Sequence, residues 1–171
     1  MRKAIIIDTS LFCVWLQVPG MEIYGSDDNR WDFDRVNKLI EEEKAKGATL
    51  VLPIATLVET GNHIAQARIK RYETAQALAK IMTDAADETS PWAAFGAQFV
   101  LWNSEELKKL AAQWPNLAAE QTSMGDATIK IVGQFYAAKG YQVEFLTADE
   151  QLKAQEPSPP ARTQKKRRSG N

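Results

Sequence analysis

The sequence predicts a three-layer α/β/α domain in which helices cover both faces of a central parallel sheet. Three short, mainly apolar runs lie at residues 4–7, 49–52 and 143–146, and the first is rich in β-branched side chains and shows no polar alternation. A run like the first is typical of a strand buried on both faces. Segments with a helical apolar period separate them, and strands that alternate with helices favour parallel pairing. The 171 residues suffice for one such domain with a substantial core.

Start and stop signals divide the segments between the strands into helices. Thr9 or Ser10 can cap the first helix, and Asp34 or a neighbour can cap the second. Pro53 suits the start of the third helix. Gly47, Gly140 and the Pro-Gly pair at 19–20 are typical stops. On these signals, helices are predicted at residues 11–17, 34–46, 55–67, 70–86, 104–114 and 126–139.

Two segments carry no helical stripe. Residues 20–33 are polar and acidic, and residues 87–98 are punctuated by Ser, Pro and Gly, so both are expected to be loops. Trp31 and Trp92 fall in these loops, where an aromatic ring can stack on a base or anchor a partner. The apolar residues 99–102 are predicted to form a further short strand.

The charge is distributed unevenly along the chain. Of 21 basic and 22 acidic residues, five basic and one acidic lie in residues 156–171, which leaves 16 basic and 21 acidic before them. Together with the Pro and Ser content, this predicts a domain at 1–152 and a disordered basic tail at 153–171. Such a tail attracts nucleic acid without regard to sequence, and a merely solubilising tail is the alternative.

The compartment is expected to be the cytoplasm. Cys13 is the only cysteine, so no internal disulfide can form and a reducing compartment is indicated. No uncharged run reaches the roughly 18 residues that a membrane span needs, so no membrane partner is expected. The single histidine excludes a two-histidine metal site and a paired-histidine acid/base mechanism.

Four carboxylates lie at the predicted strand ends or helix starts. Asp8 and Asp149 directly follow apolar strands, and Glu59 and Asp126 fall in the first turns of helices. Ligands gather at the carboxyl ends of parallel strands, so these side chains are expected to share one rim of the sheet. Carboxylate oxygens are the ligands that Mg²⁺ and Mn²⁺ prefer. The pattern therefore indicates metal-assisted hydrolysis of phosphodiesters.

Four short motifs contain these acids: IIIDTSLF, LPIATLVETG, SMGDATIKIVGQF and VEFLTADEQL. In their order and context they resemble the PIN (PilT N-terminus) domain, a family of metal-dependent ribonucleases, from residue 4 to about 152. The resemblance implies an acidic pocket that binds one or two Mg²⁺ or Mn²⁺ ions. By this resemblance the catalytic and metal-binding set is Asp8, Glu59, Asp126 and Asp149, and the pocket hydroxyls are Thr9, Ser10 and Thr147.

The function that this resemblance implies is a Mg²⁺- or Mn²⁺-dependent endoribonuclease. Clustered carboxylates repel one another, and a divalent cation offsets that repulsion, activates a water and stabilises charge on the attacked phosphate. RNA is the expected substrate, with DNA left open. PIN domains are often toxins of toxin–antitoxin pairs, so an antitoxin, another protein or a second copy of the chain are the expected protein partners. The long segments at 20–33 and 87–98 depart from a minimal toxin.

The same residues also allow purely structural roles and other functions. An acidic residue at a helix start is often a cap and not a ligand. The basic cluster of Arg68, Lys70 and Arg71 can hold a phosphodiester backbone or can be a solvated helix face. A non-catalytic PIN-like module that binds RNA or protein is the rival function. A phosphatase of the haloacid dehalogenase type ranks lower, because it needs an aspartate where Ser10 stands.

Overall fold

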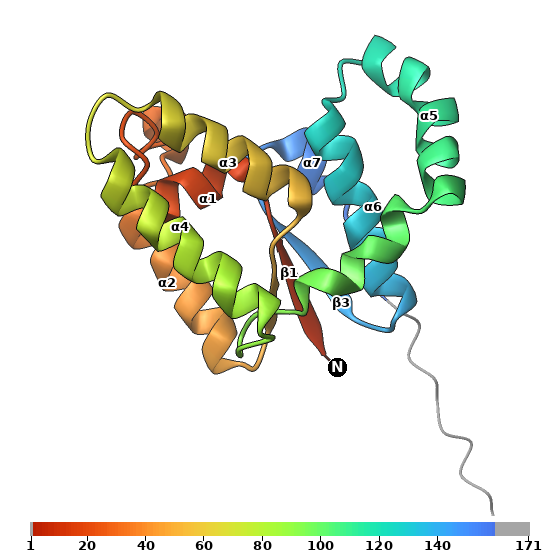
Figure 1. The fold of residues 1–171 in the computed structure, drawn as a ribbon, viewed down its shortest axis with the longest axis horizontal. Coiled ribbons are helices and arrows are strands. Elements are labelled where there is room, and N and C mark those ends of the chain that lie inside the picture. Colours follow the sequence, from red (N-terminus) through yellow and green to blue (C-terminus); the bar gives the residue numbers. More distant parts are fainter. Residues whose placement is uncertain (1, 160–171) are drawn as a thin grey trace, which may run out of the picture.

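A small parallel sheet forms the centre of the fold. The computed structural model describes residues 2–159, and in this part of the chain three strands pair in the order β2-β1-β3 (Figure 1). The central strand is parallel to both neighbours, which confirms the predicted α/β class with a parallel sheet. The strands are β1 (Lys3–Ile7), β2 (Thr49–Val51) and β3 (Gln142–Leu146).

The helices lie between the strands in sequence, except α7, which follows β3. No helix within residues 2–159 is both long and apolar enough to cross a bilayer. The helices are α1 (Thr9–Trp15), α2 (Phe33–Ala45), α3 (Ile54–Gln66), α4 (Arg71–Ala86), α5 (Ser104–Ala119), α6 (Met124–Ala138) and α7 (Glu150–Lys153), with the 3₁₀ helices η1 (Asp27–Asn29) and η2 (Phe95–Trp102).

Alternation along β1 divides the core between the two faces of the sheet. Ile5 and Ile7 belong to one buried cluster, which includes side chains of α1, α2, α3 and α4. Ala4 and Ile6 belong to the other, which includes side chains of α6 and Leu152 of α7. Since successive side chains of a strand point to opposite faces, one short run supplies both cores. Helices therefore cover both faces.

Side chains from the C-terminal segment protect the outer edge of β3. The backbone N–H of Phe145 donates to Glu156 Oε1 at 2.6 Å, and the backbone carbonyl of Phe145 accepts from Lys153 Nζ at 2.9 Å. An edge strand whose N–H and C=O groups are occupied cannot pair with another chain there. Residues 153 and 156, which follow the predicted boundary at 152, thus contact β3, and the basic residues at 162–168 lie outside the described residues.

The predicted strand at 99–102 is wrong. These residues are the second half of the 3₁₀ helix η2, with Phe99 and Val100 exposed. The segment is anchored by Gln98, which is buried and donates from Nε2 to the carbonyl of Leu52 at 2.8 Å. A short apolar run does not distinguish a strand from a helical turn by its period, and the anchoring side chain decides the conformation here.

Helix α5 also differs from its predicted extent. It continues through Pro115 to Ala119, whereas the proline was expected to end it near residue 114. A proline inside a helix removes one backbone hydrogen bond and favours a kink. The alanines and leucines on either side are strong helix formers, which favours continuation of the helix beyond it.

Two helix starts differ from those expected. The carboxylate of Asp8, and not Thr9 or Ser10, accepts a hydrogen bond at the start of α1. The cap of α2 is Asp32, a near neighbour of Asp34. Helix α6 begins at Met124, two residues earlier than predicted, with Ser123 as its cap.

The close approach of α6 to β3 gives a stability prediction. A Cβ at Gly133 would lie 2.6 Å from Cε1 of the fully buried Phe145, whereas a Cβ at Gly61 of α3 would meet nothing within 4 Å. We expect Gly133→Ala to lower the free energy of unfolding by about 1–3 kcal/mol through overpacking. Gly61→Ala should raise it by up to about 1 kcal/mol through helix propensity. Urea denaturation of both variants measures this, and an equal effect at the two positions would contradict it.

Candidate functional site

Asp8 lies at the carboxyl end of the central strand and is the hub of the candidate site. It is 8% exposed. Its Oδ1 accepts from the backbone N–H of Thr9 at 2.6 Å, and its Oδ2 accepts from Ser10 Oγ at 2.6 Å and from Thr147 Oγ1 at 2.9 Å. The hydroxyls of both strand-end segments therefore converge on one carboxylate.

The electrostatic setting of Asp8 raises its pKa above the ordinary aspartate value. Burial is the largest cause, and the negative charge of Asp126 adds to it. The hydrogen bonds from Ser10, Thr147 and the Thr9 backbone act in the opposite direction without reversing the shift. Asp8 forms no ion pair with a lysine or arginine among residues 2–159. Its charge is balanced by neutral donors alone.

Glu59 reaches the same rim from α3. The hydroxyl of Thr9 donates to Glu59 Oε2 at 2.6 Å, so Thr9 contacts Glu59 through its side chain and Asp8 through its backbone. The carboxylate lies against the start of α6, where a Cβ at Gly125 would be 2.7 Å from Glu59 Oε1. The absence of a side chain at 125 gives Glu59 its place. The motif SMGD contains this glycine, which the sequence reasoning did not use.

Asp126 is half-buried in the first turn of α6. Because Ser123 Oγ accepts from the Asp126 backbone N–H at 2.9 Å, the cap of this helix is the serine and not the aspartate. Within the described residues the Asp126 carboxylate accepts no hydrogen bond and forms no ion pair. Its charge nevertheless acts on Asp8. The structure thus brings Asp8, Glu59 and Asp126 to one rim.

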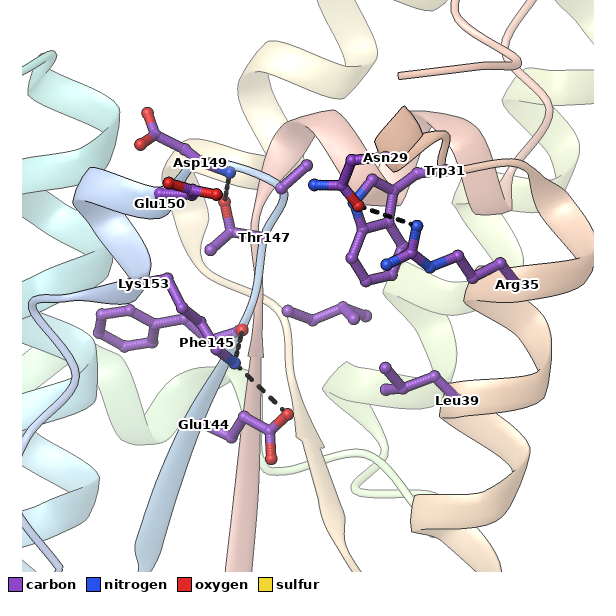
Figure 2. Close-up of a pocket in the computed structure, with 12 residues that line it drawn as sticks. Asn29, Trp31, Arg35, Leu39, Glu144, Phe145, Thr147, Asp149, Glu150 and Lys153 are labelled. Atoms are coloured by element: carbon purple, nitrogen blue, oxygen red, sulfur yellow. Dashed lines mark hydrogen bonds and ion pairs between the residues drawn. The ribbon is translucent and has the colours of Figure 1, made fainter. Parts of the chain in front are cut away.

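Asp149 lies nearby but uses its carboxylate differently. Asp149 Oδ1 accepts from the backbone N–H groups of Gln151 at 2.7 Å and Leu152 at 3.1 Å, which makes it the cap of α7. Its own N–H donates to Thr147 Oγ1 at 3.0 Å (Figure 2). Asp149 is therefore connected to Asp8 through Thr147, by its backbone and not by its carboxylate.

The donor set has the chemistry of a divalent-cation site. Carboxylates and hydroxyls are hard oxygen ligands of the kind that Mg²⁺ and Mn²⁺ take. Across residues 2–159, however, no three Asp, Glu, His or Cys side chains are grouped closely enough to hold a metal ion. Asp8, Glu59 and Asp126 share the rim without forming such a group: Thr9 connects Asp8 to Glu59, and Asp126 acts on Asp8 through its charge.

Cys13 lies beneath this rim and offers no competing chemistry. It is fully buried, and its Sγ is 3.9 Å from the hydroxyl of Thr60. Burial, with smaller contributions from the charges of Asp8 and Glu59, raises the pKa of its thiol to about 11. The thiolate is the nucleophilic form, so Cys13 is not poised for attack at neutral pH.

The basic cluster is not brought to the acids. Arg68, Lys70 and Arg71 are exposed at the turn between α3 and α4. In Figure 1 this turn lies at the opposite end of α3 from α6 and α7. No ion pair joins these three residues to the rim acids in the described part of the chain. The solvated-face alternative describes their position in the structure.

The two loop tryptophans occupy different environments. Trp92 is buried in the core, with its ring centroid 6.3 Å from that of Trp15, so its ring is not presented to solvent for stacking. Trp31 is half-buried and lines a cavity of about 280 Å³. Figure 2 shows this cavity between Trp31 and Arg35 on one side and the segment from Thr147 to Glu150 on the other. Sequence reasoning missed it because it forms only when residues 20–33 fold back beside β3.

No family model matches the chain, and no curated protein and no solved structure matches it. The resemblance to the PIN domain therefore rests on the four motifs and on the positions of their acids.

The raised pKa of Asp8 predicts a pH dependence of stability. A folded-state pKa above the ordinary value of 3.8 means that the folded protein binds this proton more tightly than the unfolded chain. The contribution is fully present below the unfolded pKa and is lost as pH rises through the folded pKa. In EDTA, the free energy of unfolding of the unmodified protein should therefore fall relative to that of Asp8→Asn as the pH rises from below the ordinary value of 3.8 toward neutral. Urea denaturation across this range measures it, and a constant difference would show that Asp8 titrates normally.

Proposed function

We propose that the protein is a Mg²⁺- or Mn²⁺-dependent endoribonuclease of PIN type, which hydrolyses RNA phosphodiester bonds at the rim that carries Asp8. One observation carries this proposal. Asp8 is a buried carboxylate without a cationic partner in residues 2–159, at the carboxyl end of the central parallel strand, with Glu59 and Asp126 on the same rim. Ligand sites of open α/β sheets lie at such ends.

The electrostatics favour a cation at this place. Burial raises the pKa of Asp8, and the negative charge of Asp126 adds to this effect. A divalent ion would offset this repulsion and, when bound, supplies an activated water and neutralises charge on the phosphate. Ser10 and Thr147 fix the orientation of the Asp8 carboxylate, and Thr9 does the same for Glu59.

The proposed ligands are Asp8, Glu59 and Asp126. Asp149 is kept in the set as a positioning residue, because its N–H holds the Thr147 hydroxyl that in turn donates to Asp8. The PIN-like three-layer fold belongs to the same proposal, supported by the parallel β2-β1-β3 order and by helices on both faces.

The resemblance to PIN domains also supports a proposal for the biological role. In this proposal the protein is a cytoplasmic toxin of a toxin–antitoxin pair, which acts on RNA and binds an antitoxin or a second copy of the chain. A single cysteine present as a buried thiol fits a reducing compartment.

A non-catalytic module that binds RNA or protein is the second candidate. The observations in its favour are that no three potential metal ligands are grouped within residues 2–159 and that the carboxylate of Asp149 caps α7.

Cleavage assays with matched variants test the nuclease. We expect Asp8→Asn and Asp126→Asn each to reduce Mn²⁺-dependent cleavage of mixed RNA by at least about 100-fold, because each removes a charge from the rim. Asp34→Asn is the control: Asp34 also lies in the first turn of a helix but is exposed on α2. Far-UV circular dichroism establishes that the variants are folded, and single-stranded DNA alongside tests the nucleic-acid preference. Undiminished cleavage by both rim variants would refute the proposal.

Thermal unfolding with and without metal separates the two candidates. A site that binds Mn²⁺ only in the folded state stabilises that state, by about 2.7 kcal/mol at a concentration 100 times Kd. We expect Mn²⁺ to raise the Tm of the unmodified protein and of Asp34→Asn, and to leave that of Asp8→Asn unchanged. A binding module without a metal site predicts no shift in any of the three.

A further inference from the structure

The side chain of Arg35 is held in a fixed position beside the cavity of Figure 2. Its guanidinium lies over the ring of Trp31, with Cζ 3.6 Å from the centroid. Nη1 donates to Asn29 Oδ1 at 3.1 Å and to the carbonyl of Arg30 at 2.7 Å. Stacking and hydrogen bonds thus immobilise an exposed side chain that would otherwise sample many rotamers.

The guanidinium of Arg35 has N–H donors without a hydrogen-bond acceptor in the described residues. No carboxylate within residues 2–159 forms an ion pair with Arg35, whereas its neighbour Arg30 lies 3.8 Å from Asp32. A guanidinium has five N–H donors, and the two hydrogen bonds of Nη1 leave those of Nε and Nη2 without a partner in this part of the chain. A pre-positioned guanidinium with an open edge is the geometry that binds phosphate.

The segment that holds Arg35 is itself ordered. Tyr24 and Trp31 exchange two backbone hydrogen bonds, of 2.9 and 2.8 Å. Between them Gly25 adopts φ +90°, and a Cβ there would overlap the carbonyl oxygen of Asn29. The turn therefore requires glycine, and it sets the position of the Asn29 side chain that contacts Arg35. Little entropy is left to lose when a ligand binds.

The side of the cavity opposite Arg35 carries acidic side chains. Asp149 and Glu150 lie there beside Thr147 (Figure 2). Lys153, the cation on that side, is already within ion-pair distance of Glu144 and Glu156. A ligand that fits must bring an anionic group to Arg35 and hydrogen-bond donors to the carboxylates. A ribonucleotide has both, because its phosphate is anionic and its sugar hydroxyls and base amino groups donate.

The cavity lies next to the acidic rim. Thr147 lines the cavity and donates its hydroxyl to Asp8, so a single side chain separates the two places. A strand with one nucleotide in the cavity would pass the rim with its next phosphodiester group. The cavity volume of about 280 Å³ is near the lower end of ordinary small-ligand sites, which suits one nucleotide and not a folded partner.

We propose that this cavity binds one nucleotide of a single-stranded RNA, adjacent to the bond that the rim acids cleave. Arg35 binds its phosphate, Asn29 and Trp31 hold Arg35 in place, and Glu150 accepts from a sugar or base donor. The position relative to the cleaved bond rests on the proposed function; the binding of RNA at Arg35 does not.

Equilibrium binding with a matched pair of variants tests this site. The probe is a fluorescein-labelled 10-nucleotide single-stranded RNA of mixed sequence, measured by anisotropy in EDTA so that metal-dependent cleavage cannot occur. We expect Arg35→Gln to weaken binding roughly tenfold, as for loss of a charged hydrogen bond. The slope of log K against log salt should also fall in magnitude by about 0.7, the value for one phosphate contact on a single strand.

Arg30→Gln is the control, because it removes the same charge from the same segment without lining the cavity. It should bind within about twofold of the unmodified protein. Arg35→Lys, which keeps the charge but loses the planar fork and the stacking, should be intermediate. Equal weakening by Arg35→Gln and Arg30→Gln would indicate general charge attraction only and overturn the site. No saturable binding by the unmodified protein would overturn it as well.

The two proposals fail separately. Loss of binding specific to Arg35, without metal-dependent cleavage by the unmodified protein, would refute the nuclease and keep the cavity as an RNA site. Cleavage that depends on Asp8, with no effect of Arg35→Gln on binding, would keep the nuclease and overturn the cavity.

Discussion

The buried carboxylate of Asp8 is the interaction on which the arrangement of this molecule depends. Its backbone N–H continues the sheet by donating to the Leu146 carbonyl at 3.0 Å, and its side chain caps α1 while it accepts from Thr147, 139 residues away. Burying a charge is costly unless hydrogen bonds satisfy it, and here two hydroxyls and a backbone N–H do so. The residue therefore ties the central strand, the first helix and the end of β3 together.

The neighbouring helices are positioned by equally short contacts. Thr56, in the first turn of α3, is fully buried and donates to the carbonyl of Ile7 at 2.7 Å, which fixes the start of α3 against the end of β1. Gly125 then lets α6 approach closely enough for Glu59 to lie against its first turn. Glu59 and Asp126 reach the rim because small or hydroxyl side chains stand where the elements meet. The presence of these two acids at the rim thus depends on close packing of the backbone of α3 and α6.

The sequence predicts the elements best where local composition decides the conformation. The apolar runs at 4–7, 49–52 and 143–146 coincide with the three parallel strands. The prediction is wrong at 99–102, where the buried side chain of Gln98 holds the segment as a 3₁₀ helix by a contact with Leu52, 46 residues away and directly after β2. That contact is tertiary and leaves no periodic trace in the sequence. The same reason hides the cavity at Arg35, since residues 20–33 gain their position only through the folded α2 and β3.

The sequence predicts which acids lie near the carboxyl ends of the strands. It does not predict which of these carboxylates cap a helix. Asp126 and Asp149 both stand near helix starts, and either could use its carboxylate on backbone N–H groups. In α6 the cap is Ser123, three residues before Asp126, so this aspartate keeps its carboxylate for the rim. In α7 no serine or threonine stands at the cap position, and Asp149 takes that place. Within the described residues, the identity of the cap thus determines which of these two carboxylates is left without a backbone partner.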